Sequence, residues 1–535
     1  MTRPARAPAA ILLAAVMTLC AAHPLAAESA GNAPSEDTLP TGDEYLLLRI
    51  CEAVRLVFSS EGASIWPGYS LAEQQFLVYV PDRWALLLNP AGSPEGFRAP
   101  PPKWPELGVA VAYHEGPYPG LVGQLEFGVD IGGIPTVAVG VPSSFTDSVE
   151  DPESTVFAYI VHEAFHQYQR AAFGEIPWSR EEKYPIENTL NSALAWLEMR
   201  VLEEALSAAA DGNRGLCEER TREFVTVRLH RWATAPPFVA EYEQGKELLE
   251  GTAKYVELRC VERAGSLDYV SSLDGTSNPM SAAFPPSSLP GLMLRELRAR
   301  MDAGHLEPQD IPRNRIYAVA ASQAYLLDHF DVPWKGQAEA AGSDFTFTEL
   351  LRSRFRIQDE ELPVLVERAK ETHDFAAILA RAEKATNDYM EACERALSAF
   401  EAQEGTAVAI TVRSSGMSRS RLTSEKKWLM QNGRACLCRR FDVYTLSGED
   451  WRFELKEEGL LEVRDWDEGT RRLSFVEPAA VTVALNGGPP APLSAGSVSF
   501  ESVKLTGSCF ELRSSRTGQL DFDGDKLALD FVPHE

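Results

Sequence analysis

His162, Glu163 and His166 have the residue types and the spacing that metal-assisted hydrolysis needs. Two histidines four residues apart lie one turn apart on one face of an α-helix, so their imidazole nitrogens can reach a single ion. Glu163 projects beside them and can take a proton from a water at that ion. The pattern predicts a Zn²⁺ site with Glu163 as the general base, and a histidine pair without a metal is the alternative.

The residues around this motif predict the helix that must carry it. Asp151 has the character of an N-cap and is followed by Pro152, which suits the first helical position. The flanks of the motif are uncharged, as a buried helix requires. Apolar residues then recur at helical spacing, at Val156, Phe157, Ile160 and Val161.

A catalytic zinc site takes three protein ligands and leaves one position open for water. A third histidine on the same helix is excluded, because Gln169 and Ala172 stand where that longer motif needs Gly and His. Glutamates on other segments are the remaining candidates, and three stand out: Glu187, Glu198 and Glu250.

Glu250 is the predicted third ligand because small residues, Gly251, Thr252 and Ala253, follow it. We expect them to let its helix approach the helix of the two histidines closely. A Gly inside a helix costs about 1 kcal/mol relative to Ala, so its presence indicates a packing need. Glu187 lies closer in the chain to His166 and stays open as the alternative.

At this point the sequence resembles the gluzincin metallopeptidases, which include the aminopeptidase N group and the bacterial collagenases. The resemblance rests on HEAFH at 162–166 and EGTAKYVE at 250–257, and it covers about residues 130–340. It implies a zincin-like catalytic domain, zinc on the two histidines and Glu250, and hydrolysis of a peptide or protein substrate. Glu257 matches the acid that ends the family's second motif. The long insertion between the motifs departs from the family pattern.

Tyr317 matches the tyrosine that stabilises the oxyanion in the aminopeptidase N group, although Val319 and Ala320 replace that group's Lys and Gly. The resemblance implies a catalytic role for Tyr317, and a packed core tyrosine is the alternative. Residues 132–139 lack the glutamate with which that group holds a substrate amino terminus, so aminopeptidase specificity is not predicted.

The hydrophobic patterns predict an α+β fold with a metallopeptidase region at 43–404. Its α/β part is 43–170 and its mostly helical part is 171–404. Residues 405–535 alternate with period two and carry turns such as Asn486-Gly487, which predicts an antiparallel β-sandwich-like accessory domain. The strand candidates of the first part are 76–80, 84–88, 109–113, 124–129 and 136–141. The helix candidates are 45–58, 186–210, 216–234, 237–264, 289–304, 314–330 and 362–401.

The composition indicates the class of protein and excludes two kinds of partner. Its 535 residues are 44% hydrophobic and 24% charged, which is typical of a soluble globular protein, and its net charge is -27. Nucleic acids and anionic membranes need a basic face, so neither is an expected partner.

The first 27 residues have the pattern of a signal peptide, with two arginines, an apolar run at 9–22 and small residues at 26–27. They predict export to the periplasm or the exterior, followed by a disordered lead-in at 28–42 and no membrane span after processing. A non-catalytic secreted binding protein with a structural zinc site is the competing hypothesis.

Seven cysteines lie outside the signal peptide, an odd number. Cys436 or Cys438 could reach Cys509 on a neighbouring strand, and buried free thiols are the alternative.

Overall fold

The structure, a computed structural model, divides the chain into two compact units that are described separately. Unit 1 comprises 1–179, 194–306 and 310–375, and unit 2 comprises 180–193, 307–309 and 376–535. The predicted signal peptide, nearly all of the predicted lead-in, Asp151 and residues 124–128 lie outside the described residues. The described residues are 42–58, 65–80, 83–100, 109–118, 129–141, 152–174, 176, 180–267, 269–271, 278–279, 283–302, 307–413, 418–423, 427–431 and 433–531.

The predicted α+β class is confirmed, since both helices and sheets form from the patterns that predicted them. Unit 1 holds a five-stranded sheet with the order β3-β2-β1-β5-β4, in which β1 and β5 are parallel and the other neighbours antiparallel. Every residue of β1 and β2 is buried. The strands are β1 (Phe76–Val80), β2 (Trp84–Leu88), β3 (Val111–Glu115), β4 (Val129–Ile131) and β5 (Ile134–Gly140), with a separate pair β6 (Val270–Ser271) and β7 (Asn278–Pro279).

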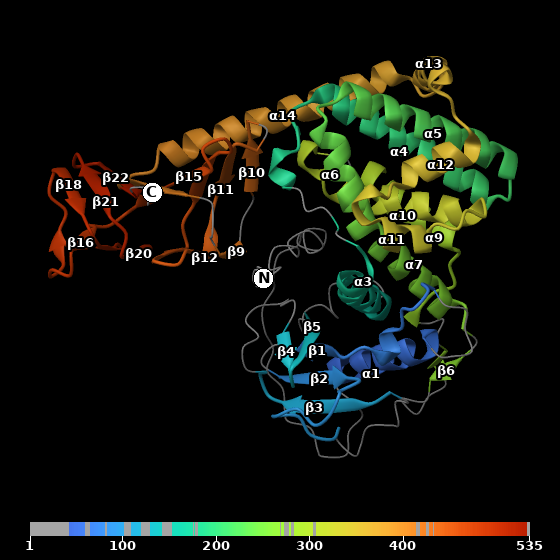
Figure 1. The fold of residues 1–535 in the computed structure, drawn as a ribbon, viewed down its shortest axis with the longest axis horizontal. Helices are drawn as coiled ribbons and strands as arrows, with labels where there is room; N and C mark the ends of the chain where they lie inside the picture. The colour runs from blue at the N-terminus through green and yellow to red at the C-terminus, as the bar shows by residue number, and fades with distance from the viewer. Residues whose placement is uncertain are drawn as a thin grey trace, which may run out of the picture. The chain divides into compact units, whose positions relative to one another are not determined.

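Helices make up most of the rest of unit 1 (Figure 1). They are α1 (Gly42–Val57), α3 (Pro152–Ala172), α4 (Thr189–Ala210), α5 (Arg214–Thr234), α6 (Phe238–Lys246), α7 (Thr252–Gly265), α9 (Leu289–Asp302), α10 (Asn314–His329), α11 (Lys335–Ala341), α12 (Phe347–Phe355) and α13 (Leu362–Thr372). Shorter turns are the π-helical η5 (Glu247–Gly251) and the 3-10 turns η3 (Leu71–Glu73), η7 (Gly342–Asp344) and η8 (Asp359–Glu361). The 3-10 turn η6 (Pro308–Asp310) lies at a boundary, with its first two residues in unit 2. The helix α3 packs against β5, α1 and α7, and α10 packs against η5, α7 and α9.

Two helix predictions differ from the structure. The helix expected at 237–264 contains the π-helical turn η5, which separates α6 from α7. The helix expected at 362–401 is two helices, because Asp374 has φ +47°, a left-handed conformation that ends α13 before α14 (Phe375–Glu401) begins.

Unit 2 contains α14 beyond Phe375, the 3-10 turn η4 (Glu181–Lys183) and two large sheets. The strand orders are β10-β11-β14-β15-β8-β22-β21-β18 and β17-β16-β19-β20-β13-β12-β9, and β8 with β22 is the one parallel pair among the described strands of this unit. The strands are β8 (Thr406–Arg413), β9 (Ser418–Thr423), β10 (Lys427–Met430), β11 (Ala435–Cys438), β12 (Phe441–Ser447), β13 (Trp451–Lys456), β14 (Leu460–Asp465), β15 (Thr470–Glu477), β16 (Thr482–Leu485), β17 (Ala491–Pro492), β18 (Gly496–Phe500), β19 (Val503–Thr506), β20 (Phe510–Ser514), β21 (Gly518–Phe522) and β22 (Lys526–Phe531).

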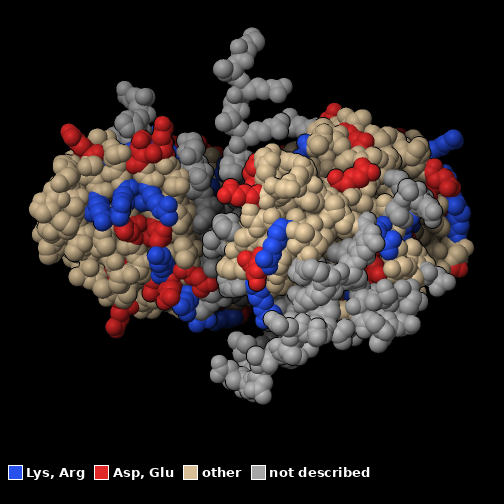
Figure 2. Space-filling view, turned by 90° about the horizontal axis from the view of Figure 1, so that it is seen from below, with Lys and Arg blue, Asp and Glu red and all other residues tan. Residues whose placement is uncertain are grey.

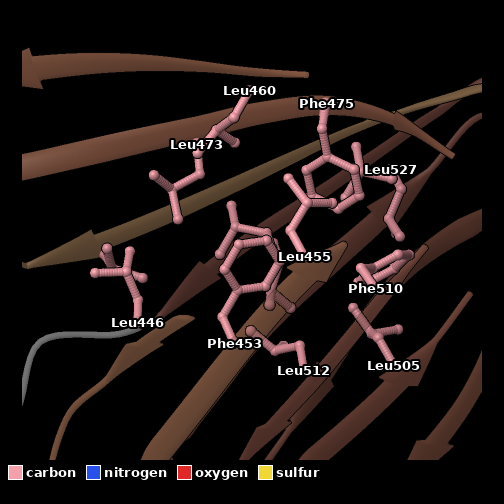
Figure 3. Packing of buried hydrophobic residues seen from close by; sticks show 14 of the residues in the cluster. Leu446, Phe453, Leu455, Leu460, Leu473, Phe475, Leu505, Phe510, Leu512 and Leu527 are labelled. Atoms are coloured by element: carbon pink, nitrogen blue, oxygen red, sulfur yellow. The ribbon is translucent and has the colours of Figure 1, made fainter. Parts of the chain in front are cut away.

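The two sheets of unit 2 share one hydrophobic core (Figure 3). Phe453 and Leu512 enter it from one sheet, and Leu473 and Phe475 enter it from the other. Alternate residues of β13 face this core, as period-two patterning requires. The seven cysteines of the described residues are all buried, and none of them forms a disulfide. The structure therefore agrees with buried thiols and not with a bridge to Cys509.

No helix among the described residues is long and apolar enough to cross a membrane.

Candidate metal centre

The helix α3 begins at Pro152, as the sequence predicts, and presents His162 and His166 on one face. A hydrogen bond from the side chain of Gln167 to the carbonyl of Pro135 (2.7 Å) ties this helix to β5. His162, Glu163 and His166 are 4%, 6% and 6% exposed, and their ligand atoms lie within 4.8 Å of one another. The predicted motif therefore forms a buried cluster of two imidazoles and a carboxylate.

The structure brings Glu250 to the same cluster from η5. Its Oε2 lies 3.4 Å from Nε2 of His162 and 3.2 Å from Nε2 of His166. Glu250 is 1% exposed, and Oε1 of the same carboxylate lies 3.4 Å from Nζ of Lys246. Three potential ligand atoms thus converge from two elements that lie far apart in the sequence.

The donor set fits a zinc ion. Two ligand atoms about 2.1 Å from zinc at tetrahedral angles lie about 3.4 Å apart, close to both distances from the Glu250 oxygen. Nε2 of His166 is buried and makes no hydrogen bond within the described residues, although it lies 3.2 Å from a carboxylate oxygen. A buried polar atom normally has a hydrogen-bond partner. A metal ion bound between this nitrogen and the Glu250 oxygen would supply the missing partner.

Further hydrogen bonds orient both imidazole rings. Nδ1 of His162 donates to Oε2 of Glu257 (3.1 Å), and Nδ1 of His166 donates to Oε1 of Gln169 (2.6 Å). Because Nδ1 carries the proton in each ring, Nε2 is free to bind a metal. The amide of Gln169 in turn donates to the carbonyl of Leu249 (2.8 Å), which joins α3 to the turn that carries Glu250.

The charges of the site favour a cation. Burial lowers the pKa of His162, but hydrogen bonds to Glu250 and Glu257 outweigh this and raise it to about 10. Burial alone would raise the pKa of Glu250, but the two histidines hold it well below its ordinary value. Burial raises the pKa of Glu163, an effect that His166 and His162 oppose. The carboxylates here attract positive charge, whether as a proton or as a metal.

Gly251 permits a close approach, but to a different helix from the one that the sequence suggested. A Cβ at Gly251 would lie 2.1 Å from Cβ of Ala320, which belongs to α10. The helix that follows Glu250, α7, does pack against α3 as expected, but Gly251 itself meets α10 and not the histidine helix. The link to α3 is made instead by Gln169, whose amide donates to the hydroxyl of Thr252 (2.6 Å).

Of the other two candidate ligands, Glu198 pairs with arginines and does not join the cluster. Glu198 is fully buried and ion-paired, with Oε2 lying 3.2 Å from Nη1 of Arg315 and 3.4 Å from Nη1 of Arg228. Glu187 is half-buried in the turn before α4 and belongs to unit 2, and its role as a ligand stays a prediction.

Two tyrosines lie near the histidines, Tyr317 on α10 and Tyr159 on α3 itself. The ring of Tyr317, on α10, stacks on the ring of His162 with centroids 5.8 Å apart and planes 27° apart. Tyr159 lies one turn before Glu163 on α3, and its buried hydroxyl has no hydrogen-bond partner in the described part of the chain. Burial and then the charge of Glu163 raise the pKa of this phenol. Sequence reasoning missed Tyr159, although a phenol four residues before Glu163, on the same helix face, was a usable signal.

Comparison with protein-family models, with curated proteins and with solved structures gave no match.

Proposed function

We propose that this chain is an exported zinc-dependent peptidase of gluzincin type, with a zincin-like catalytic region in unit 1. The observation that supports it is the convergence of Nε2 of His162 and Nε2 of His166 on one oxygen of Glu250, with Glu163 beside them. The sequence resemblance supplies the reaction class, and the pattern of the first 27 residues supplies the export proposal. The β-rich region would be an accessory module.

In this proposal, His162, His166 and Glu250 hold the zinc. Zinc, when bound, acts as a Lewis acid that polarises a carbonyl and lowers the pKa of water toward 7. Glu163 accepts the proton of the attacking water and passes it to the leaving amine of the peptide bond. Burial raises the pKa of Glu163, which brings this carboxyl closer to the range in which a general base works at neutral pH. Tyr317 is placed beside His162 and would donate its phenolic hydrogen to the substrate oxyanion.

The decisive variant is Glu163→Gln. We expect it to retain zinc, because Glu163 is not a ligand, and to lose peptide cleavage about a hundred- to ten-thousand-fold, since an amide accepts no proton. Zinc content and turnover of a mixed peptide library are measured on the same samples. Glu153→Gln makes the same chemical change on the same helix away from the cluster and should behave as wild type.

The competing function is a binding protein with a structural zinc site. The low exposure of the histidines and Glu163, 4–6%, is the observation that favours it. It predicts stoichiometric zinc, no cleavage by wild type, and only a change in stability in Glu163→Gln. Turnover at the wild-type rate in the Glu163→Gln variant would refute the role of Glu163 as general base.

A further inference from the structure

Unit 2 contains a second site that the zinc chemistry does not use. It is a pocket of about 490 Å³ lined by Lys183, Gln431, Arg434 and Trp466. Gln431 and Arg434 lie in the turn between β10 and β11, and Trp466 follows β14. Lys183 ends η4, a segment more than two hundred residues earlier in the chain. The volume lies within the range of about 300–1,000 Å³ that ligand pockets occupy.

The wall of this pocket is fixed by close packing. Gly433 has φ +82°, and a Cβ there would lie 1.3 Å from the carbonyl oxygen of Glu182, so the backbone of η4 rests directly on the β10–β11 turn. The buried guanidinium of Arg464 donates to both oxygens of Glu462 (3.1 and 3.0 Å) and lies 3.5 Å from Oε1 of Glu182. These contacts hold η4 and the two turns together.

Cations gather around the indole of Trp466. The guanidinium of Arg180, the ammonium of Lys183 and the guanidinium of Arg464 lie 5.2, 5.3 and 5.6 Å from a Trp466 ring centroid. Cations at this distance are attracted by the negative face of the ring. The indole therefore holds Lys183 at the pocket, and Arg180 next to Trp466, without using their hydrogen-bonding capacity.

The exposed cations of the pocket are not neutralised within the described residues. Arg180, Lys183 and Arg434 are exposed, and none of them has a described carboxylate as an ion-pair partner. This is unusual in a chain with 78 acidic and 51 basic residues. On the face drawn in Figure 2, basic and acidic side chains lie among one another. A group of unpaired cations in an acidic protein creates a local positive potential that attracts anions.

We propose that this pocket binds an acidic peptide segment. Arginine and lysine donors bind carboxylates, and arginine does so with two parallel hydrogen bonds. Gln431 can both donate to and accept from a peptide backbone, which favours a peptide over a simple anion. The pocket is also too large for one inorganic anion to fill. The proposal does not depend on the zinc site, because all the residues that carry it belong to unit 2.

The test uses the full-length protein and two fluorescein-labelled peptides, one of alternating Glu and Gly and one with Gln in place of every Glu. Fluorescence anisotropy should show that wild type binds the Glu peptide at least about tenfold more tightly, because only that peptide carries carboxylates for the cations of the pocket. Lys183→Glu and Arg434→Glu should each weaken that binding about tenfold or more. Arg434→Lys, which keeps the charge but not the two parallel hydrogen bonds, should weaken binding less than Arg434→Glu does.

The matched control is Arg452→Glu, which makes the same charge change on an exposed residue of β13 in the other sheet. Its binding of the Glu peptide should stay within about twofold of wild type, because exposed charges separated by more than a Debye length are screened. Thermal melting of every variant checks that it folds. Equal binding of the two peptides, an equal loss in Arg452→Glu and Arg434→Glu, or displacement of the peptide by equimolar inorganic phosphate would each overturn the proposal.

Discussion

The buried hydroxyl of Tyr159 lowers the stability of the fold, so a structural role does not account for it. A buried hydroxyl without a partner destabilises a protein by about 1–3 kcal/mol, and this one has none in the described part of the chain. It lies four residues before Glu163, so both side chains share one face of α3. We expect this hydroxyl to donate to the substrate oxyanion, which would give it a partner only during the reaction.

Tyr159→Phe should therefore have two effects of opposite sign. The free energy of unfolding should rise by about 1 kcal/mol, because an unpaired polar group is removed from the interior. Turnover should fall about a hundredfold, the typical effect of losing one oxyanion donor, at unchanged zinc content. Tyr69→Phe is the matched control, since Tyr69 also has a buried hydroxyl without a described partner. It should gain stability and keep its turnover, and equal turnover in both variants would remove Tyr159 from the mechanism.

The choice of third ligand gives a second prediction at this scale. Glu250→Ala should lower zinc affinity by several orders of magnitude, because one of three ligands is lost. Gln169→Ala should lower it about 10–100-fold through the released ring of His166. Glu187→Ala should leave zinc affinity unchanged. Zinc titration against a competing chelator measures all three, and weakened binding in Glu187→Ala alone would show that the ligand assignment is wrong.

The π-helical turn η5 positions Glu250, and Gly251 at its end is its most sensitive residue. A methyl group there would overlap Cβ of Ala320 on α10. Gly251→Ala should lower the free energy of unfolding by about 1–3 kcal/mol, as overpacking does, and should weaken zinc binding as η5 shifts. The double variant Gly251→Ala/Ala320→Gly should recover most of the zinc affinity.

Gly336→Ala is the control for this prediction, because a Cβ at Gly336 on α11 meets nothing within 4 Å. It should be neutral or slightly stabilising. Chemical denaturation and zinc titration test the set. No rescue in the double variant would mean that the Gly251–Ala320 approach does not control the ligand.

The helix α6, which leads into η5, carries part of a buried ion network. Nη1 of Arg231 donates to Oε1 of Glu243 (3.0 Å), and the Arg315 guanidinium also pairs with this carboxylate. Burial would raise the pKa of Glu243, but Arg231, Arg315 and Arg228 outweigh it and hold the pKa far below the ordinary value of 4.5. A depressed pKa contributes stability that is present above pH 4.5 and is lost as the pH falls below it.

Glu243→Gln should therefore change both the level and the pH dependence of stability. At neutral pH the variant should be about 3–5 kcal/mol less stable, because a buried ion network loses one partner. The difference from wild type should shrink as the pH falls below 4.5. Glu367→Gln, in an exposed pair with Lys370, should be close to wild type throughout. Urea denaturation between about pH 3 and pH 7 makes the comparison, and a constant difference across that range would contradict the assignment.

Local patterns could predict the elements of the site, but contacts between distant segments decide how it works. The helix of His162 follows from spacing and from Pro152, which are local signals. Small residues after Glu250 pointed to a packing need, yet the neighbour that Gly251 meets, Ala320, is set by the tertiary fold. The small residues after Glu250 distinguish it from Glu198 in the sequence, but the arginines that pair with Glu198 come from other helices and no local pattern predicts them.

At the scale of the whole molecule, the division of the chain was the least predictable feature. Residues 180–193 belong to unit 2 although they lie between segments of unit 1 in the sequence. Their assignment depends on contacts such as that of Gly433 with Glu182, which no periodicity encodes. The β-rich region itself was predictable, since period-two alternation and turn residues are local.

The two units give the last prediction, which concerns metal removal. A ligand that binds only the folded state stabilises it by RT ln(1 + [L]/Kd), about 4 kcal/mol at a thousandfold excess over Kd. The ligand atoms lie on α3 and η5, both in unit 1. Chelation of zinc should therefore raise amide hydrogen exchange in peptides that cover α3, η5 and α7. Peptides from β12, β13 and β20 in unit 2 should exchange at the same rate with and without the metal.

Glu250→Ala should show the chelated pattern even when zinc is present. If chelation changed exchange equally in both sets of peptides, or in neither, the site assigned to His162, His166 and Glu250 would not be where the metal binds.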